Sequence, residues 1–231
     1  MPLLPGDPVS LIGLGLTAAT IAVLLISDWP RAHVLSAALL VFFGVQFVDQ
    51  WLTGARVGMD ELALSTRGLV NGDWWSPLTY MFLHAGFLHI FGNLWILATA
   101  GPMLEDSVGP NAFLAIYALG GLAAALAGVA LSLTTGIVST GSLMVGASGA
   151  IFGVLTAFAV RHPKEKLPFI LIFLVVWLPS MTVLLIYLAL NLAYIFTDTT
   201  IAWYGHFAGF LVGLIAASSG RLKPAEGQEP G

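Results

Sequence analysis

The sequence contains no cysteine, and only 9% of its 231 residues are charged. The absence of cysteine excludes disulfide bonds, a thiol nucleophile and any zinc site built from thiolates. The basic residues are few and scattered and the net charge is −4, which excludes a phosphate-binding surface for nucleic acid. Hydrophobic residues make up 58% of the chain, and a soluble domain would have about 25% charged residues. The composition therefore indicates an integral membrane protein.

Seven apolar segments of the chain are candidates for transmembrane helices. About 20 apolar residues cross the hydrocarbon core as a helix, because in lipid the backbone must satisfy its own hydrogen bonds. The predicted spans are residues 9–27, 34–52, 84–104, 112–134, 147–161, 178–197 and 203–219. No Lys or Arg precedes the first span and no small-x-small cleavage site follows it, so we predict a retained helix rather than a signal peptide. The sequence thus predicts an all-α polytopic membrane protein, a helical bundle of about seven transmembrane helices.

The positions of Lys and Arg predict the orientation of these spans. Six of the eight basic residues fall on one side when seven spans alternate: Arg31, Arg161, Lys164, Lys166, Arg221 and Lys223. Cytoplasmic loops carry an excess of Lys and Arg, so this side is predicted to be cytoplasmic. The N-terminus and the loops 53–80 and 135–146 then face outward, and the C-terminus is cytoplasmic.

The run "KLPFILIFLVVWLPSM" at 166–181 is apolar but does not fit the pattern of the spans. Pro168 and Pro179 bracket a stretch that is too short to cross the bilayer comfortably as a helix. We predict that this segment lies at the membrane interface or dips into it.

Polar side chains in the third span are functional candidates, because such residues are costly in lipid. In "FLHAGFLHIFGNLW", His89 and Asn93 are four residues apart and share one helix face, while His84 lies about a turn and a half further out. Two interpretations stay open for these residues. They hold helices together by hydrogen bonds, or they direct donors at a charge that develops during a reaction.

Two glycine stripes with four-residue spacing occur in the fifth and the last spans: Gly149 and Gly153, and Gly205, Gly209 and Gly213. Small residues at this spacing let helix backbones approach closely, so we predict that these two helices pack together. Ser148 and His206 each stand beside one stripe. Packing would bring the Ser148 hydroxyl within hydrogen-bonding distance of the His206 imidazole, the geometry in which a base activates a nucleophile. Each residue alone also fits a structural role.

Two other chemistries do not fit the motifs. The nucleophile elbow of soluble hydrolases is G-x-S-x-G after a strand, but Ala150 occupies the position of the second glycine within a helix-like apolar run. A membrane metalloprotease would show H-E-x-x-H, whereas Ile90 and Phe91 follow His89 and no carboxylate completes a site. No metal is therefore predicted, and the set of serine, histidine and asparagine in glycine-rich spans favours acyl transfer.

Four motifs follow one another along residues 60–217: "GDWWSPLTYMFLHAGFLHIFGNLW", "MLEDSVG", "MVGASGAIFG" and "GHFAGFLVG". In content and order they resemble the rhomboid family of intramembrane serine proteases. The resemblance implies a bacterial-type rhomboid with a six-helix core and one extra N-terminal span. It divides the chain into the extra span and first core span (1–55), the remainder of the catalytic core (56–219) and a polar cytoplasmic tail (220–231).

The resemblance also implies a role for each candidate residue. Ser148 matches the nucleophile and His206 the general base of the family. His89, Asn93 and the backbone N–H of Ser148 would bind the oxyanion. His84 matches the outer histidine of the same segment and is an accessory candidate.

Two positions depart from the family pattern. Ser76 follows Trp75 where the family often has arginine, which removes a possible anchor of that loop. Phe152 stands where many members have tyrosine, and it keeps a ring face for an imidazole but lacks the hydroxyl. Phe152 is therefore an accessory candidate.

The acidic residues near the candidate site suggest no third catalytic group. Asp198 is close to His206 in sequence, but we expect it in an exposed loop, and so we predict a Ser–His dyad. Glu105 and Asp106, at the far end of the third span, are expected to cap or tether a loop.

The sequence therefore predicts a serine endopeptidase that hydrolyses peptide bonds in or near transmembrane segments of membrane proteins, without a cofactor. Its partners would be such substrates and the bilayer, and its location the inner membrane of a bacterial cell. One alternative is a rhomboid-like protein that binds membrane clients without cutting them. A less favoured one is a small transporter, since the spans lack the charged filters expected for a solute.

Overall fold

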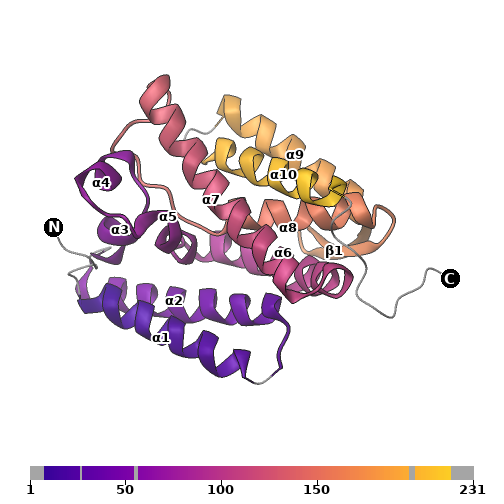
Figure 1. The fold of residues 1–231 in the computed structure, drawn as a ribbon, viewed down its shortest axis with the longest axis horizontal. Coiled ribbons are helices and arrows are strands. Elements are labelled where there is room, and N and C mark those ends of the chain that lie inside the picture. The colour runs from indigo at the N-terminus through magenta and orange to yellow at the C-terminus, as the bar shows by residue number, and fades with distance from the viewer. Residues whose placement is uncertain (1–7, 27, 55–56, 198–200, 220–231) are drawn as a thin grey trace. The chain divides into compact units, whose positions relative to one another are not determined.

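The structure is a computed structural model that describes residues 8–26, 28–54, 57–197 and 201–219 (Figure 1). Within these residues, seven helices lie over the seven predicted spans: α1 (Pro8–Leu25), α2 (Arg31–Thr53), α6 (Phe87–Val108), α7 (Pro110–Thr134), α8 (Ser148–Arg161), α9 (Ser180–Thr197) and α10 (Trp203–Ser218). Short helical segments connect α2 to α6: α3 (Val57–Leu62), α4 (Thr66–Asn71), α5 (Ser76–Thr79) and the 3-10 turn η1 (Tyr80–Phe82). The predicted helical fold is confirmed.

Three helices in the described part of the chain are long and apolar enough to cross a bilayer: Arg31–Leu52, Phe87–Val108 and Pro110–Thr134. Four further apolar helices are shorter: Pro8–Val23, Ser148–Arg161, Ser180–Phe196 and Trp203–Ser218. Helices of this composition bury their apolar surface in lipid or against one another. The number of seven spans stays a prediction.

The chain folds as two compact units, Met1–Leu94 with Ala125–Ser148, and Trp95–Ala124 with Gly149–Gly231. In the first unit α1 packs along α2 (Figure 1). A buried cluster of Phe42, Leu62, Ala63 and Leu83 joins α2 to α3 and to the turn before α6. The loop that leads to Ser148 is held to the same region, because Leu64 and Met144 exchange two backbone hydrogen bonds of 3.0 and 2.8 Å.

The segment between α8 and α9 is an antiparallel β-hairpin of β1 (Lys166–Leu171) and β2 (Leu174–Pro179). Its two prolines are tolerated because each strand of a two-stranded hairpin has a free edge that needs no N–H. The turn consists of Ile172, at φ 58°, and Phe173. These side chains are 80% and 94% exposed, so the hairpin presents an apolar tip.

The exposed tip fits the predicted interfacial position of this segment, which a single introduced cysteine can test. The chain has no other cysteine, so a spin label at Phe173→Cys reports from one place. We expect the label in liposomes to be accessible to oxygen and protected from a water-soluble nickel complex, because burial of the neighbouring Ile172 side chain in lipid gains about 2 kcal/mol. A label at Lys164→Cys, an exposed polar position before β1, is the water-accessible control. Equal nickel accessibility at both positions would contradict the interfacial placement.

Candidate active site

His84 and Asn93 form a buried hydrogen-bonded pair in the first unit. The His84 Nδ1 lies 3.2 Å from the carbonyl oxygen of Phe82, to which it can only donate, so Nδ1 carries the proton. Nε2 then accepts from Asn93 Nδ2 at 2.9 Å. Burial, and secondarily the neighbouring His89, lower the pKa of His84 to about 3. His84 is therefore a neutral acceptor that orients the Asn93 amide.

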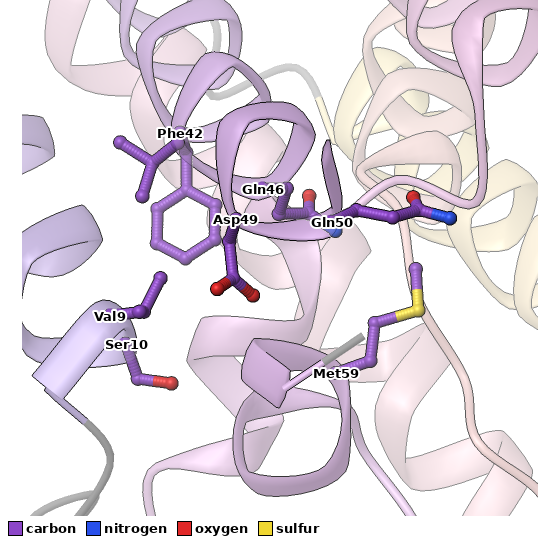
Figure 2. A pocket seen from close by; sticks show the side chains of 8 residues that line it. Val9, Ser10, Phe42, Gln46, Asp49, Gln50 and Met59 are labelled. Carbon is purple, nitrogen blue, oxygen red and sulfur yellow. The ribbon is translucent and has the colours of Figure 1, made fainter. Parts of the chain in front are cut away.

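Gln46 on α2 supports the backbone of His84. The Gln46 side chain accepts the His84 N–H at 3.0 Å and donates to its carbonyl oxygen at 3.5 Å. Gln46 also lines a hollow bounded by α1, α2 and α3, into which Asp49 and Phe42 of α2 project (Figure 2). None of the sequence-predicted site residues lines this hollow. Gln46 therefore links this hollow to the candidate site through the backbone of His84.

His89 lies against the loop that precedes Ser148. Its Nδ1 accepts a long hydrogen bond of 3.4 Å from the Ala85 N–H, which leaves Nε2 as the donor of a neutral ring. Gly146 has a φ of 111°, and a Cβ there would come within 2.6 Å of the His89 Nε2. The backbone N–H of Gly146 donates to the carbonyl oxygen of Tyr80 at 2.9 Å. Only glycine fits a position that has both a left-handed backbone and an imidazole edge in the space of a Cβ.

Ser148 is the first residue of α8 and is half-buried. The N–H groups of the first helical turn have no acceptor within the helix, and they carry the positive end of the helix dipole. Negative charge is stabilised there. The backbone N–H of Ser148 is thus a donor of the kind an oxyanion requires.

In the second unit, His206 of α10 is held on two sides. The ring of Phe152 stacks on its imidazole at 4.7 Å between centroids and 13° between planes. Its Nδ1 lies 2.8 Å from Asn191 Oδ1, and Asn191 Nδ2 donates to the carbonyl oxygen of Trp203 at 3.1 Å. Sequence reasoning missed Asn191, although a polar residue inside an apolar span is the signal that singled out His89. Asp198, the acidic residue near His206 in the sequence, lies outside the described residues.

The glycine stripes of α8 and α10 lie against one another. A Cβ on Gly209 would overlap the carbonyl oxygen of Gly149, and a Cβ on Gly213 would overlap that of Gly153. A Cβ on Gly149 would lie 3.2 Å from the carbonyl oxygen of Gly205. Backbone-to-backbone contact of this kind is possible only without side chains.

The two acidic residues near the end of α6 differ in exposure. Glu105 is buried and Asp106 is exposed, and the carbonyl oxygen of Glu105 accepts the N–H of Gly109, which follows the helix with φ 84°. Their expected structural role stays a prediction.

Residues 71–221 match the Rhomboid domain, and the chain therefore belongs to the rhomboid family. It is 28% identical over 151 residues to the rhomboid protease GluP of Bacillus subtilis, an alignment that covers 65% of this chain and 27% of GluP. It is 32% identical over 165 residues to RHOMBOID-like protein 5 of Arabidopsis thaliana, covering 71% of this chain and 50% of that protein. Inactive RHOMBOID-like protein 8 of Arabidopsis thaliana is 33% identical over 93 residues, covering 40% of this chain and 26% of that protein. The chain thus spans half or less of the length of these relatives.

Proposed function

We propose that this integral membrane protein is an intramembrane serine endopeptidase in which Ser148 and His206 form the catalytic dyad. The observation that supports this most directly is the close approach of Gly149 to Gly205. Each glycine is one peptide bond from a proposed catalytic residue, and consecutive Cα atoms are about 3.8 Å apart. Ser148 and His206 therefore each lie about one residue from a backbone contact between α8 and α10.

The dyad hydrolyses a peptide bond in two steps. His206 accepts the proton of Ser148 Oγ while the oxygen attacks the carbonyl carbon of the substrate. The C–N bond of the tetrahedral intermediate breaks, the proton passes from His206 to the leaving amine, and an ester on Ser148 remains. Water, deprotonated by His206, then attacks the ester carbon. The bond to Ser148 Oγ breaks, the proton passes from His206 to Oγ, and the acid product leaves.

The oxyanion of the intermediate requires donors that are fixed before the reaction. The Asn93 amide has two N–H groups, and its bond to His84 occupies one of them and fixes the direction of the other. His89 Nε2 and the backbone N–H of Ser148 supply further donors. This arrangement supports the assignment of His89, Asn93 and Ser148 to the oxyanion site, with His84 as the residue that orients Asn93.

The proposed substrates are transmembrane segments of other proteins. A regular helix hides its amides in hydrogen bonds, so a segment must unwind before it is cut. The excess of basic residues on one side supports a bacterial inner membrane, with the N-terminus outside and the C-terminus in the cytoplasm. Within the chain, 1–55 would form the extra span and first core span, and 56–219 the remainder of the catalytic core. The proposed tail 220–231 lies outside the described residues.

A non-proteolytic role as a client-binding protein is the second candidate, because one relative is named as inactive. Reaction of the purified chain with a fluorophosphonate, followed by mass spectrometry, separates the two functions. We expect one covalent adduct, on Ser148, and cleavage of some members of a panel of transmembrane peptides in liposomes. A folded protein that forms no adduct and cuts no peptide would overturn the proposed activity.

The Asn93→Ala variant tests the oxyanion site. Loss of a donor that acts only in the transition state is expected to lower kcat by about 10²-fold and to change KM little. His84→Leu, which removes the acceptor that orients Asn93, should lower kcat less, by about 10-fold. Thr99→Ala, which removes a hydroxyl bonded within the same helix α6, is the control and should keep full activity. Weaker substrate binding with unchanged turnover would instead assign Asn93 a structural role.

A further inference from the structure

We propose that Asn191 is a positioning residue that holds His206 in the tautomer required for catalysis, so that the dyad acts as a Ser–His–Asn arrangement. The inference rests on the proposed function of Ser148 and His206. Asn191 is 3% exposed in α9, and both ends of its amide have partners in the second unit. Its role is to control which nitrogen of His206 carries the proton.

The orientation of the Asn191 amide follows from its second partner. The carbonyl oxygen of Trp203 is only an acceptor, so the atom that lies 3.1 Å from it must be the Nδ2 donor. An amide rotated by 180° would place its oxygen against the carbonyl oxygen of Trp203 and leave the buried Asn191 oxygen without a donor, at a cost of about 1–3 kcal/mol. Oδ1 therefore faces His206.

The oxygen of Asn191 in turn decides the tautomer of His206. Oδ1 accepts and does not donate, so the 2.8 Å contact requires a proton on His206 Nδ1. In a neutral ring, Nε2 is then unprotonated and can accept the proton of Ser148 Oγ. The opposite tautomer would present an N–H to the hydroxyl and could not act as a base. The same contact stabilises the imidazolium, in which Nδ1 keeps its proton.

Phe152 and Asn191 restrict different motions of the ring. The stacked Phe152 fixes the plane of the imidazole, and the bond to Oδ1 fixes its rotation within that plane. An amide achieves this without the cost of an ion in an apolar helix, where a carboxylate is expensive. In this arrangement an amide, rather than a carboxylate, orients the proposed base.

Two variants of Asn191 separate the positioning role from a structural one. Asn191→Leu removes both hydrogen bonds at similar volume, whereas Asn191→Asp keeps an acceptor toward His206 and loses the donor to Trp203. We expect the leucine variant to lower kcat by about 10²-fold with little change in KM, and the aspartate variant to stay within about 10-fold of wild type. If Asn191 only ties α9 to Trp203, both variants lose activity equally, and that result would overturn the proposal. Full activity of Asn191→Leu would also overturn it.

A second measurement does not depend on activity. In protein with ¹⁵N-labelled histidine, the His206 signals, assigned by their loss in His206→Gln, should show Nδ1 protonated in wild type and a mixture of tautomers in Asn191→Leu. An unchanged tautomer would overturn the proposal even if the protein cuts nothing, whereas absence of cleavage with the expected tautomer overturns only the proposed activity. Ser180→Ala removes a buried hydrogen bond at the first residue of α9, from Ser180 Oγ to the His162 carbonyl oxygen. As the control, it should lower thermal stability and leave both the tautomer and kcat unchanged.

Discussion

Replacement of Ser148 by alanine is expected to lower kcat/KM for a transmembrane substrate by at least about 10⁴-fold and to abolish the fluorophosphonate adduct. The variant lacks the oxygen that forms the covalent bond, so no ester intermediate can exist. Loss of one oxygen from the half-buried Ser148 leaves the glycine contact between α8 and α10 intact, and the melting temperature should stay close to that of wild type. Fragment mass spectrometry and a melting curve measure both effects.

His206→Ala should be as inactive as Ser148→Ala, because the two residues act on the same proton. The double variant should then be no worse than either single one, since residues that act as a unit show non-additive losses. Substantial cleavage by Ser148→Ala would refute the assignment of the nucleophile. Additive losses in the double variant would mean that the two residues do not form a dyad.

Ser107 provides a matched control for the serine variant. Ser107 lies at the end of α6, and its hydroxyl is 2.8 Å from His162 Nε2, so the second unit contains a serine hydrogen-bonded to a histidine outside the proposed dyad. Arg161 Nε also donates to this hydroxyl, at 3.4 Å, and Ser107 is buried. A hydroxyl engaged in this way is expected to tie α6 to the end of α8. Ser107→Ala should therefore leave both the adduct and cleavage unchanged.

The apolar pattern predicted that the long helices exist, because hydrocarbon leaves a spanning backbone no alternative to internal hydrogen bonds. Helix ends were predicted less well. The third span was predicted to begin at His84, but α6 begins at Phe87. The backbone of His84 is bonded instead to Gln46, 38 residues earlier, whose side chain accepts the His84 N–H and donates to its carbonyl oxygen. A contact so distant in sequence leaves no local signal, and it removes His84 from the helix that carries His89 and Asn93.

The hairpin and Asn191 were missed for different reasons. The run from Lys166 to Pro179 is apolar on both faces and has no alternation, and its turn has Ile172 and Phe173 instead of the usual asparagine and glycine. In contrast, Asn191 was visible as a polar residue in an apolar span. Its partner, His206, lies 15 residues further on in another helix. A carboxylate is the usual partner of a catalytic histidine, and an amide oxygen accepts the same hydrogen bond without charge.

Gly209→Val is expected to damage both stability and activity, since the contact between α8 and α10 holds the helix of His206. Even a single Cβ at this position would overlap the carbonyl oxygen of Gly149, which is backbone and cannot rotate away. The helices must therefore separate, at a cost of about 3 kcal/mol in the free energy of unfolding. A displacement of about 1 Å already costs a positioned catalytic group about 10²-fold, so the loss in kcat should exceed that. A melting curve and the cleavage rate measure the two effects, and Gly209→Ala should be intermediate in both.

The control for this variant is the same substitution at a helical glycine with open space. A Cβ on Gly44 in α2 meets no atom within 4 Å, so Gly44→Val should change neither melting temperature nor cleavage appreciably. Its comparison with Gly209→Val removes the general effect of a β-branched residue in a helix, which is less than about 1 kcal/mol relative to glycine. If Gly209→Val kept wild-type stability and activity, neither the fold nor the reaction would require the close approach of Gly149 to α10. The proposed dyad would then lose its main structural support, because the close contact of two glycine backbones is what would bring Ser148 to His206.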